Sequence, residues 1–335
     1  MSTDDLAAKI HRGAMVVDAH ADTLAEVAHG AFALGRENQV GHWDIPRARL
    51  GNVGVQFFTV TDFAPHVPRA MELVDFAYRQ IAAFPEDLRL ITRYEDILDA
   101  RNEGKIGMLL SIEGGEALGG ELGLLRNFHR LGVRAMGLTW NRRNELADGV
   151  LDARSKGGLS EFGAQVVAEM ESLGMLVDVS HLSEPGFWDV DAIANRPYIA
   201  SHSNARALCD HPRNLTDSQI RAIAARGGVI GINFCPEFLS EEGNATIEDV
   251  ISHIDYIARL AGVEHVGLGS DFDGISHTPK GLESVARLPQ ITRELLGRGY
   301  GEDAILAILG GNFLRVLEAC MKPAAAAHNI PSTHQ

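Results

Sequence analysis

The chain has 335 residues, of which 45% are hydrophobic and 22% charged, so it can bury a large core and is neither disordered nor collagen-like. Its 45 acidic and 30 basic side chains give a formal net charge of −15, the wrong sign for a protein that binds nucleic acid by neutralising phosphates. No run reaches the ~18 consecutive apolar residues of a membrane span, and the first residues do not resemble a signal peptide. We expect a soluble cytoplasmic protein, with neither nucleic acid nor a membrane as a partner.

Cysteine usage limits the kind of metal site. Cys209, Cys235 and Cys320 are odd in number, widely spaced and in no CxxC pattern. Neither a disulfide framework nor a thiolate zinc site is expected. Any metal would have to be bound by histidine and carboxylate side chains.

Short apolar runs recur along the chain, separated by stretches long enough for a helix. This alternation is typical of βα units and a parallel sheet. The first halves of the runs are almost continuously apolar, which fits strands covered on both faces. The eight predicted strands lie within residues 14–22, 53–63, 106–115, 133–141, 174–182, 198–204, 228–236 and 265–274.

Amphipathic segments lie between these runs, with apolar positions at helical spacing. The predicted helices cover residues 69–84, 161–173, 217–226, 247–261 and 283–298. Length alone would allow two doubly wound domains, but no linker or composition shift divides the chain. The sequence therefore predicts an α/β fold, a single (β/α)₈ TIM barrel over residues 1–322, followed by a loosely ordered tail at 323–335.

Ionisable residues stand at the ends of several predicted strands, followed by loops that contain glycine or serine. Taken singly, each has a structural explanation, because a histidine at a strand end is often only hydrogen-bonded and an aspartate can start a turn. The carboxyl ends of all barrel strands meet at one mouth, however, so we expect these side chains to converge there as a metal site. The set comprises His20, Asp22, Glu113, His181, His202 and Asp271.

Three imidazoles with two or three carboxylates suit Zn²⁺, with Mn²⁺ or Co²⁺ as substitutes. A single catalytic zinc commonly takes three protein ligands, so the surplus indicates two metals per chain. Glu113 is the best candidate for the bridging carboxylate, because Gly114 and Gly115 let the backbone approach closely behind it. Two metals that share a hydroxide would provide a nucleophile at neutral pH, which indicates hydrolysis.

At this point the sequence resembles a known family, the membrane (renal) dipeptidases, and in particular its bacterial members. The resemblance follows the chain in order and covers most of its length. The matching segments are VVDAHADTL at 16–24, SIEGGEAL at 111–118, VDVSHLS at 177–183, IASHSNARALCDHPRNL at 199–215, VGLGSDFDG at 266–274 and GGNFLRV at 310–316.

The resemblance implies a role for each metal-site residue. His20 and Asp22 would bind one zinc, His181 and His202 the other, and Glu113 would bridge the two. The implied activity is that of a binuclear zinc dipeptidase, in which the metal-bridging hydroxide attacks the peptide bond.

Two further residues take roles from the same resemblance. Asp271 would carry the proton from the bridging water to the leaving amine, and Arg213 would bind the terminal carboxylate of the substrate. The substrates implied are dipeptides with a free carboxylate, of L-L and also L-D configuration. Relatives are often dimers, so a homodimer is consistent with the family.

The chain departs from the family pattern at two substrate contacts. Trp140 stands where relatives carry a histidine that helps to stabilise the oxyanion, and Cys235 stands where they carry a tyrosine. Asn141 or Asn144 could supply a replacement donor. We therefore take Trp140, Asn141 and Cys235 as candidate substrate contacts whose change affects substrate choice rather than metal binding.

Two alternatives stay open at this stage. The same metal centre could hydrolyse another amide, an ester or a lactone, since the pocket differs at Trp140 and Cys235. The barrel could also be a non-catalytic binding protein, although such a protein would have no need for two metals beside a proton carrier.

Overall fold

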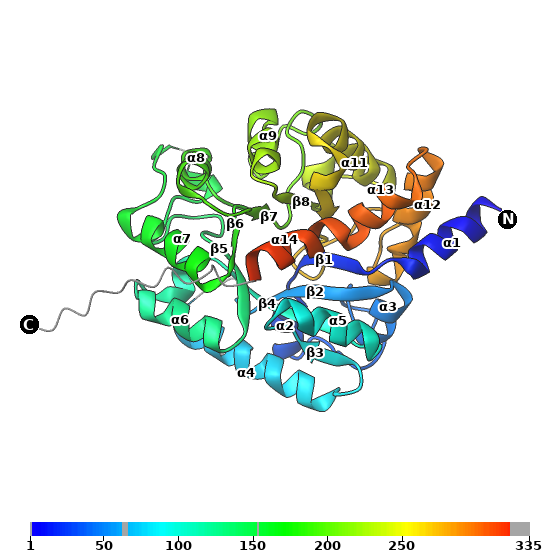
Figure 1. Cartoon of the computed structure of the whole chain (residues 1–335), viewed down its shortest axis with the longest axis horizontal. Helices are drawn as coiled ribbons and strands as arrows, with labels where there is room; N and C mark the ends of the chain where they lie inside the picture. Colours follow the sequence, from blue (N-terminus) through cyan, green and yellow to red (C-terminus); the bar gives the residue numbers. More distant parts are fainter. Residues whose placement is uncertain (1, 62–65, 153, 322–335) are drawn as a thin grey trace, which may run out of the picture.

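The computed structural model describes residues 2–61, 66–152 and 154–321. Parallel strands form its centre and helices surround them (Figure 1). The strands are β1 (Val16–Ala21), β2 (Val53–Thr59), β3 (Leu88–Leu90), β4 (Ile106–Glu113), β5 (Val133–Gly137), β6 (Leu176–Asp178), β7 (Ile199–Ala200), β8 (Val229–Ile232) and β9 (Val266–Leu268).

The helices alternate with these strands along the chain. They are α1 (Thr3–Gly13), α2 (Thr23–Ala28), α3 (Ile45–Leu50), α4 (Val67–Ala83), α5 (Tyr94–Asn102), α6 (Leu122–Arg130), α7 (Glu161–Leu173), α8 (Glu184–Ile193), α9 (Asp217–Ala225), α10 (Pro236–Leu239), α11 (Ile247–Ala261), α12 (Pro289–Gly297), α13 (Glu302–Leu306) and α14 (Asn312–Met321).

Eight strands close into a parallel ring in the order β1, β2, β4, β5, β6, β7, β8, β9 and back to β1. Each lies within one of the eight predicted runs, so the predicted TIM barrel is confirmed. The short strand β3 was not predicted. It pairs with the first residues of β4, on the same edge of β4 that pairs with β5 further along the strand. β3 is therefore attached to the ring but is not one of its eight strands.

Four of the five predicted helices are confirmed within two residues at each end, as α4, α7, α9 and α11. The fifth prediction, over 283–298, is wrong in its first part. Pro289 occupies the first turn of α12, where its missing N–H costs nothing, and the preceding residues form a tight turn instead. The predicted tail at 323–335, and residues 62 and 63 of the second run, lie outside the described residues.

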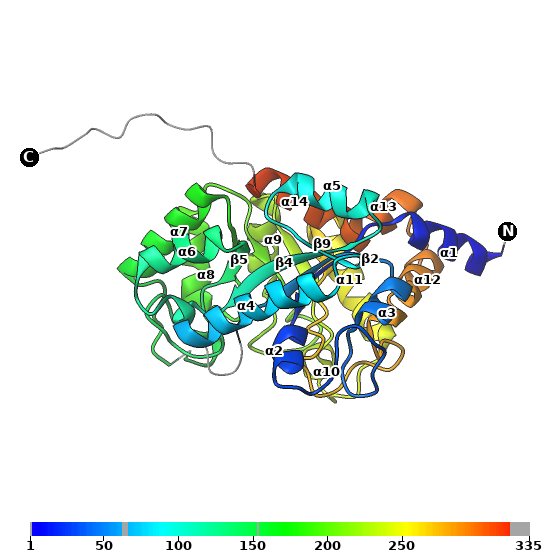
Figure 2. The same cartoon turned by 90° about the horizontal axis from the view of Figure 1, so that it is seen from below.

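Helix α14 closes the amino-terminal end of the barrel. Its buried residues Phe313, Val316 and Leu317 pack in one cluster with strand side chains such as Val17 and Val229, which point into the ring. Figure 2 shows α14 and α5 on one side of the strands and α2 and α10 on the other. The loops that follow the strands lie at the barrel end opposite α14, where α2 and α10 also lie.

The same segment explains an apolar stretch in the sequence. Residues 302–321 are long and apolar enough to cross a membrane by length and composition, but half of that stretch is buried in the fold. Its apolar side chains pack against β1 and β9, as expected for a core helix of a barrel.

Glycines allow the barrel to narrow beside β7, just before His202. A Cβ atom on Gly231 would lie 2.0 Å from the Ser201 carbonyl oxygen, and one on Gly269 would lie 1.8 Å from it. Only a residue without a side chain fits at either position. This close approach holds the end of β7 against β8 and the loop after β9.

A buried histidine fixes the loop that follows His202. His253 on α11 is 1% exposed; its Nδ1 accepts a hydrogen bond from the Ala205 N–H (3.1 Å) and its Nε2 donates to the Leu239 carbonyl (3.1 Å). Burial lowers the pKa of His253 to about 4, although the Leu239 carbonyl opposes the shift. The imidazole is therefore neutral in the folded protein near neutral pH.

This pKa predicts a loss of stability in acid. The unfolded chain, with a histidine pKa of about 6.5, binds the proton more tightly than the fold does, so the contribution of neutral His253 is complete above that pH and is lost as pH falls toward 4. The full effect is about 3 kcal/mol. We expect His253→Gln to lose less unfolding free energy than the parent between pH 7 and 4.5, measured by urea denaturation. Substitution of the exposed His277 by Gln is the control, and an unchanged pH slope in His253→Gln would contradict the assignment.

Candidate metal centre

Three imidazoles converge on one carboxylate oxygen at the barrel mouth. His20 lies in β1, His181 and His202 follow β6 and β7, and Glu113 is the last residue of β4. The Oε1 atom of Glu113 lies 3.6, 3.0 and 3.3 Å from the Nε2 atoms of His20, His181 and His202. All three histidines are buried. The predicted convergence of these strand-end residues is therefore present in the fold.

The hydrogen bonds of the Nδ1 atoms of His181 and His202 determine whether their Nε2 atoms, which face Glu113, carry a proton. The Nδ1 of His181 lies 2.8 Å from the Asn141 Oδ1, which can only accept. The Nδ1 of His202 lies 2.7 Å from the Ser201 Oγ, whose own proton goes to Asp178. Both Nδ1 atoms thus carry the proton, and both Nε2 atoms present lone pairs.

Those lone pairs face one another across a short gap. The Nε2 atoms of His181 and His202 are 2.9 Å apart, and the Glu113 Oε1 lies within 3.3 Å of both. Three acceptors this close repel one another unless a cation lies between them. The donor set therefore fits a metal ion, and the Nδ1 partners are of the type that orients metal-binding histidines.

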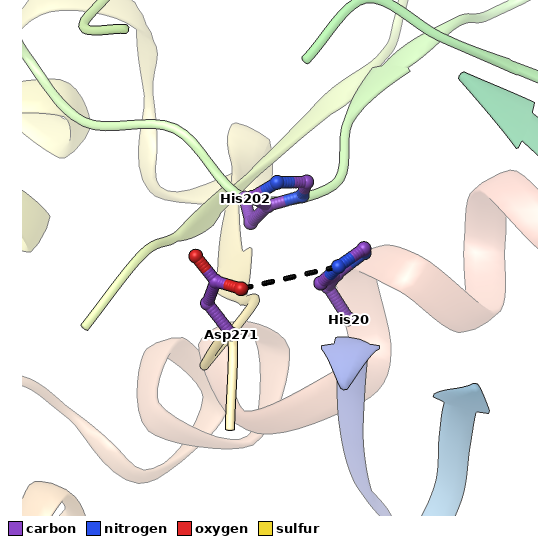
Figure 3. Close-up of side chains that lie close together, drawn as sticks. All are labelled: His20, His202 and Asp271. Atoms are coloured by element: carbon purple, nitrogen blue, oxygen red, sulfur yellow. Dashed lines mark ion pairs between the residues drawn. The ribbon is translucent and has the colours of Figure 1, made fainter. Parts of the chain in front are cut away.

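A second part of the cluster surrounds His20. Its Nε2 lies 3.4 Å from the Asp22 Oδ2 and 3.9 Å from the Asp271 Oδ1, yet this buried nitrogen has no hydrogen-bond partner in the described part of the chain. Figure 3 shows Asp271 beside His20, with the His20 ring near that of His202; the two ring centroids are 3.9 Å apart. An unpartnered buried nitrogen among carboxylates also fits a metal ligand, because its lone pair has no other partner.

The charges of the cluster lead to the same interpretation. Burial lowers the pKa of His20, but Glu113 and Asp22 outweigh it and raise the value to about 10. Burial, with a smaller effect of Arg213, lowers the pKa of His181 to about 3. The carboxylates around His20 therefore favour positive charge at this place, which a metal ion would supply.

Two side chains of the cluster depend on unusual backbone conformations. His181 has φ 65° and Asp271 has φ 61°, in the left-handed region that non-glycine residues rarely adopt. Each such residue costs on the order of 1–3 kcal/mol, and such costs concentrate at functional sites. The surrounding fold must hold both residues in place.

Two buried aspartates that we did not predict support the cluster. Asp18 in β1 accepts from the N–H (2.7 Å) and the hydroxyl (2.6 Å) of Ser270, the residue before Asp271. Asp178 in β6 accepts likewise from the N–H and hydroxyl of Ser201, the residue before His202. One sequence signal was available, since Asp18 lies two residues before His20 and therefore on the same face of the strand.

Asp271 is oriented by its neighbours. Its backbone N–H donates to the His20 carbonyl (3.2 Å), and its Oδ2 accepts from the Asn233 Nδ2 (2.9 Å). The Oδ1 atom is left facing the cluster. One carboxylate oxygen is thus fixed and the other lies beside the metal-binding nitrogens.

A cavity of ≈480 Å³ lies over the cluster. It is lined by Asp22, Glu113 and Asp271 and also by three predicted substrate contacts, Trp140, Asn141 and Cys235. The Cys235 thiol donates to the Glu237 carboxylate (3.1 Å), and burial raises the pKa of that thiol. Contact of Trp140, Asn141 and Cys235 with a substrate stays a prediction.

The two asparagines considered as replacement donors differ in position. Asn141 lines the cavity, but its Oδ1 is bonded to His181. Asn144 is absent from the cavity lining, and its amide group is bonded to Glu116 and to the turn around Leu146. The geometry therefore argues against Asn144 as a donor to substrate.

Arg213 lies in the wall beside the cluster. Its Nη2 donates to the His202 carbonyl (3.1 Å), and its guanidinium carbon is 5.5 Å from the centre of the Phe238 ring, which lines the cavity. Arg213 itself lines a neighbouring chamber rather than this cavity. Its predicted contact with the substrate carboxylate stays a prediction.

A (β/α)₈ barrel with a buried histidine and carboxylate cluster at its mouth defines the class of metal-dependent hydrolases. The sequence model of the membrane dipeptidases, peptidase family M19, matches residues 5–330, and the chain belongs to this family. It is a metallo-dipeptidase of that family, as the resemblance implied.

Two related proteins also carry the name dipeptidase. The chain is 39% identical over 293 residues to dipeptidase aclJ of Aspergillus oryzae, covering 83% of this chain and 69% of that protein. It is 36% identical over 296 residues to the uncharacterized dipeptidase C965.12 of Schizosaccharomyces pombe, covering 82% and 71%.

A solved structure shows the same fold. A metallo peptidase from Rhodobacter sphaeroides, liganded with a phosphinate mimic of the dipeptide L-Ala-D-Ala, superposes with a TM-score of 0.84 at 28% identity, covering 91% of this chain and 99% of that one.

The link from Asp178 through Ser201 to His202 can be tested by metal affinity. We expect Ser201→Ala to lower zinc affinity about 10- to 100-fold, because His202 loses the acceptor that fixes its protonated nitrogen. Metal content after dialysis against graded zinc buffers measures the change. Ser252→Ala, at a half-buried serine on α11 whose hydroxyl donates to the Glu248 carbonyl, is the matched control. Equal affinity of the two variants would remove Ser201 from the metal centre.

Proposed function

We propose that the protein hydrolyses dipeptides with a free C-terminal carboxylate and that it uses two zinc ions, with Mn²⁺ or Co²⁺ as substitutes. The observation that carries the metal count is the position of Glu113. This carboxylate belongs both to a group with His20 and Asp22 and to a group with His181 and His202. One bridging carboxylate between two ligand groups is the arrangement of a binuclear site.

Metal ions held by these residues would supply a water that ionises near neutral pH and would polarise the carbonyl of the scissile bond. The donor set suits zinc, because it combines imidazole nitrogens with carboxylate oxygens.

Asp271 is the group placed to move the proton. Its Oδ1 faces the cluster while Asn233 holds its Oδ2, so one oxygen can take a proton from the attacking water and pass it to the leaving amine nitrogen. Asp271 also lies with His20 and His202 in a group that could itself bind a metal. The two roles predict different consequences of the same substitution.

The size of the cavity supports a small substrate. A volume of ≈480 Å³ falls within the range typical of small-molecule sites, ~300–1,000 Å³. The Rhodobacter sphaeroides relative binds a dipeptide mimic. We propose that Trp140 and Cys235 shape the choice of side chain in this cavity and that Arg213 binds the terminal carboxylate.

Substitution of Asp271 separates its two roles. If it is the proton carrier, Asp271→Asn retains both metals and lowers kcat by about 10²- to 10⁴-fold, the usual contribution of a general acid or base. Kinetics together with metal analysis of the same sample measure this. Asp210→Asn, at an exposed aspartate, is the control. Loss of a metal from Asp271→Asn would instead identify Asp271 as a ligand.

A substrate panel tests the dipeptidase activity itself. L-Ala-L-Ala and L-Ala-D-Ala should be hydrolysed by the zinc-loaded protein, and their C-terminal amides should be hydrolysed at least about tenfold more slowly in kcat/KM, because the amide lacks the anion that Arg213 binds. A chelator should abolish turnover and added Zn²⁺ should restore it. If the metal-loaded protein does not hydrolyse dipeptides but cleaves an ester or a lactone, the result would favour the alternative, a hydrolase of other substrates at the same metal centre.

A further inference from the structure

The cavity over the metal centre, which we call the metal cavity, has an acidic lining. Four carboxylates line it, those of Asp22, Glu113, Asp271 and Glu237, and none of its described lining residues is a lysine or an arginine. The first three belong to the groups that could hold a metal ion. Glu237 belongs to none of these groups, so the chemistry proposed above leaves its charge without a role.

Glu237 lies near the opening of the metal cavity. It is in the short helix α10, after β8, and its side chain is 51% exposed. The side chains of Asp22 and Asp271, at the metal centre, are 16% and 14% exposed. A group that reaches Glu237 must therefore extend from the metal centre toward solvent.

A buried cysteine fixes Glu237 relative to the metal centre. The Cys235 thiol donates to the Glu237 Oε2 (3.1 Å), and burial raises the pKa of this thiol, so it keeps its proton. The Cys235 N–H donates to the Asn233 Oδ1 (2.6 Å), and the Asn233 Nδ2 donates to the Asp271 Oδ2 (2.9 Å). A short chain of hydrogen bonds therefore links Glu237 to Asp271 and holds both in one arrangement.

No lysine or arginine among the described residues forms an ion pair with Glu237. Its Oε1 lies 3.5 Å from the Nε2 of His277, which is 53% exposed. His211 also lines the cavity, but burial and, less strongly, Arg213 lower its pKa, so its imidazole is neutral near neutral pH. Arg213 itself is 5.5 Å from the centre of the Phe238 ring and lines the neighbouring chamber instead. The charge of Glu237 is therefore open to a cationic ligand.

Two aromatic residues complete a wall that suits a cation on an apolar stem. Trp140 and Phe238 line the metal cavity together with Glu237, and Ile275 adds aliphatic surface. Aromatic rings attract ammonium and guanidinium groups to their faces. The net charge of −15 also attracts cations to the protein as a whole. The matching ligand has methylene groups that end in a positive charge.

We propose that Glu237 makes the enzyme select substrates in which the residue on the amino side of the scissile bond has a cationic side chain, of the lysine or arginine type. This selection rests on the proposed function, in which Arg213 takes the terminal carboxylate and leaves the metal cavity to the other residue. The α-ammonium group is attached next to the scissile carbonyl and stays beside the carboxylates at the metals. Only a longer side chain extends to the opening, where Glu237 lies.

Two substrates of matched shape test this selection. L-norleucyl-L-alanine has the side-chain carbons of L-lysyl-L-alanine but no ammonium group. We expect the metal-loaded full chain to hydrolyse the lysyl dipeptide with a kcat/KM about three- to fivefold higher, the effect of one ion pair and one ring contact at a half-exposed site. The assays are run at about pH 8, so that imidazoles of ordinary pKa carry no charge. High salt should reduce the preference, because it screens the pair.

Variants at position 237 test whether the carboxylate is the cause. Glu237→Gln should bring the ratio of kcat/KM for the lysyl over the norleucyl dipeptide to about one. Glu237→Lys should lower the ratio below one, because its ammonium group repels that of the substrate. Glu241→Gln removes the same charge from an exposed glutamate just after α10, outside the cavity lining, and should retain the ratio of the parent.

Calorimetry measures the same selection without turnover. The probes are phosphinate mimics of the two dipeptides, the class of compound that the Rhodobacter sphaeroides relative binds. We expect the lysyl mimic to bind the metal-loaded parent about three- to fivefold more tightly than the norleucyl mimic. The two mimics should bind the Glu237→Gln variant with about equal affinity.

The outcomes separate this selection from the dipeptidase activity. Equal kcat/KM values for the two dipeptides in the parent overturn the selection and leave the activity in place. A fall by the same factor for both dipeptides in Glu237→Gln also overturns it, and would assign Glu237 to the α-ammonium group or to the fold. If the metal-loaded protein neither hydrolyses these dipeptides nor binds their mimics, the proposed function itself fails, and the selection fails with it.

Discussion

The whole barrel mouth depends on the convergence of lone pairs around one oxygen of Glu113. Three imidazole nitrogens lie within 3.6 Å of that atom, and two of them are held unprotonated by partners on their far side. Lone pairs this close repel one another unless a positive charge lies between them, and a metal ion would supply that charge. Because ligands must be deprotonated to bind a metal, metal affinity at such a site depends on pH.

The site is held in place by hydrogen bonds between neighbouring strands. Asp18 reaches from β1 to Ser270 after β9, and Asp178 reaches from β6 to Ser201 after β7. In both cases a strand carboxylate takes the N–H and the hydroxyl of the serine that precedes a site residue. The same device thus occurs on two sides of the ring. Because it joins adjacent strands, the geometry of the cluster is tied to the register of the barrel.

Much of this could be predicted from the sequence, because apolar runs mark strands and barrel topology brings their carboxyl ends together. The positions of His20, Glu113 and His202 followed from that rule alone. The three residues of β3 were too few to give a pattern, and Pro289 moved the start of a helix. The direction of a loop side chain could not be predicted from the sequence. His181 has a left-handed backbone conformation, and Arg213 faces a chamber that several loops form together.

Closure of the ring has a consequence for how the chain acquires its structure. β1 lies between β2 and β9, and α14 fills the end of the barrel beneath them. During synthesis one edge of β1 therefore stays unpaired until β9 has left the ribosome, and the apolar side chains that point into the ring stay uncovered until α14 has. Contacts that join the two ends of a chain form slowly and leave apolar surface exposed meanwhile. The nascent protein is thus most vulnerable to aggregation just before its last helix docks.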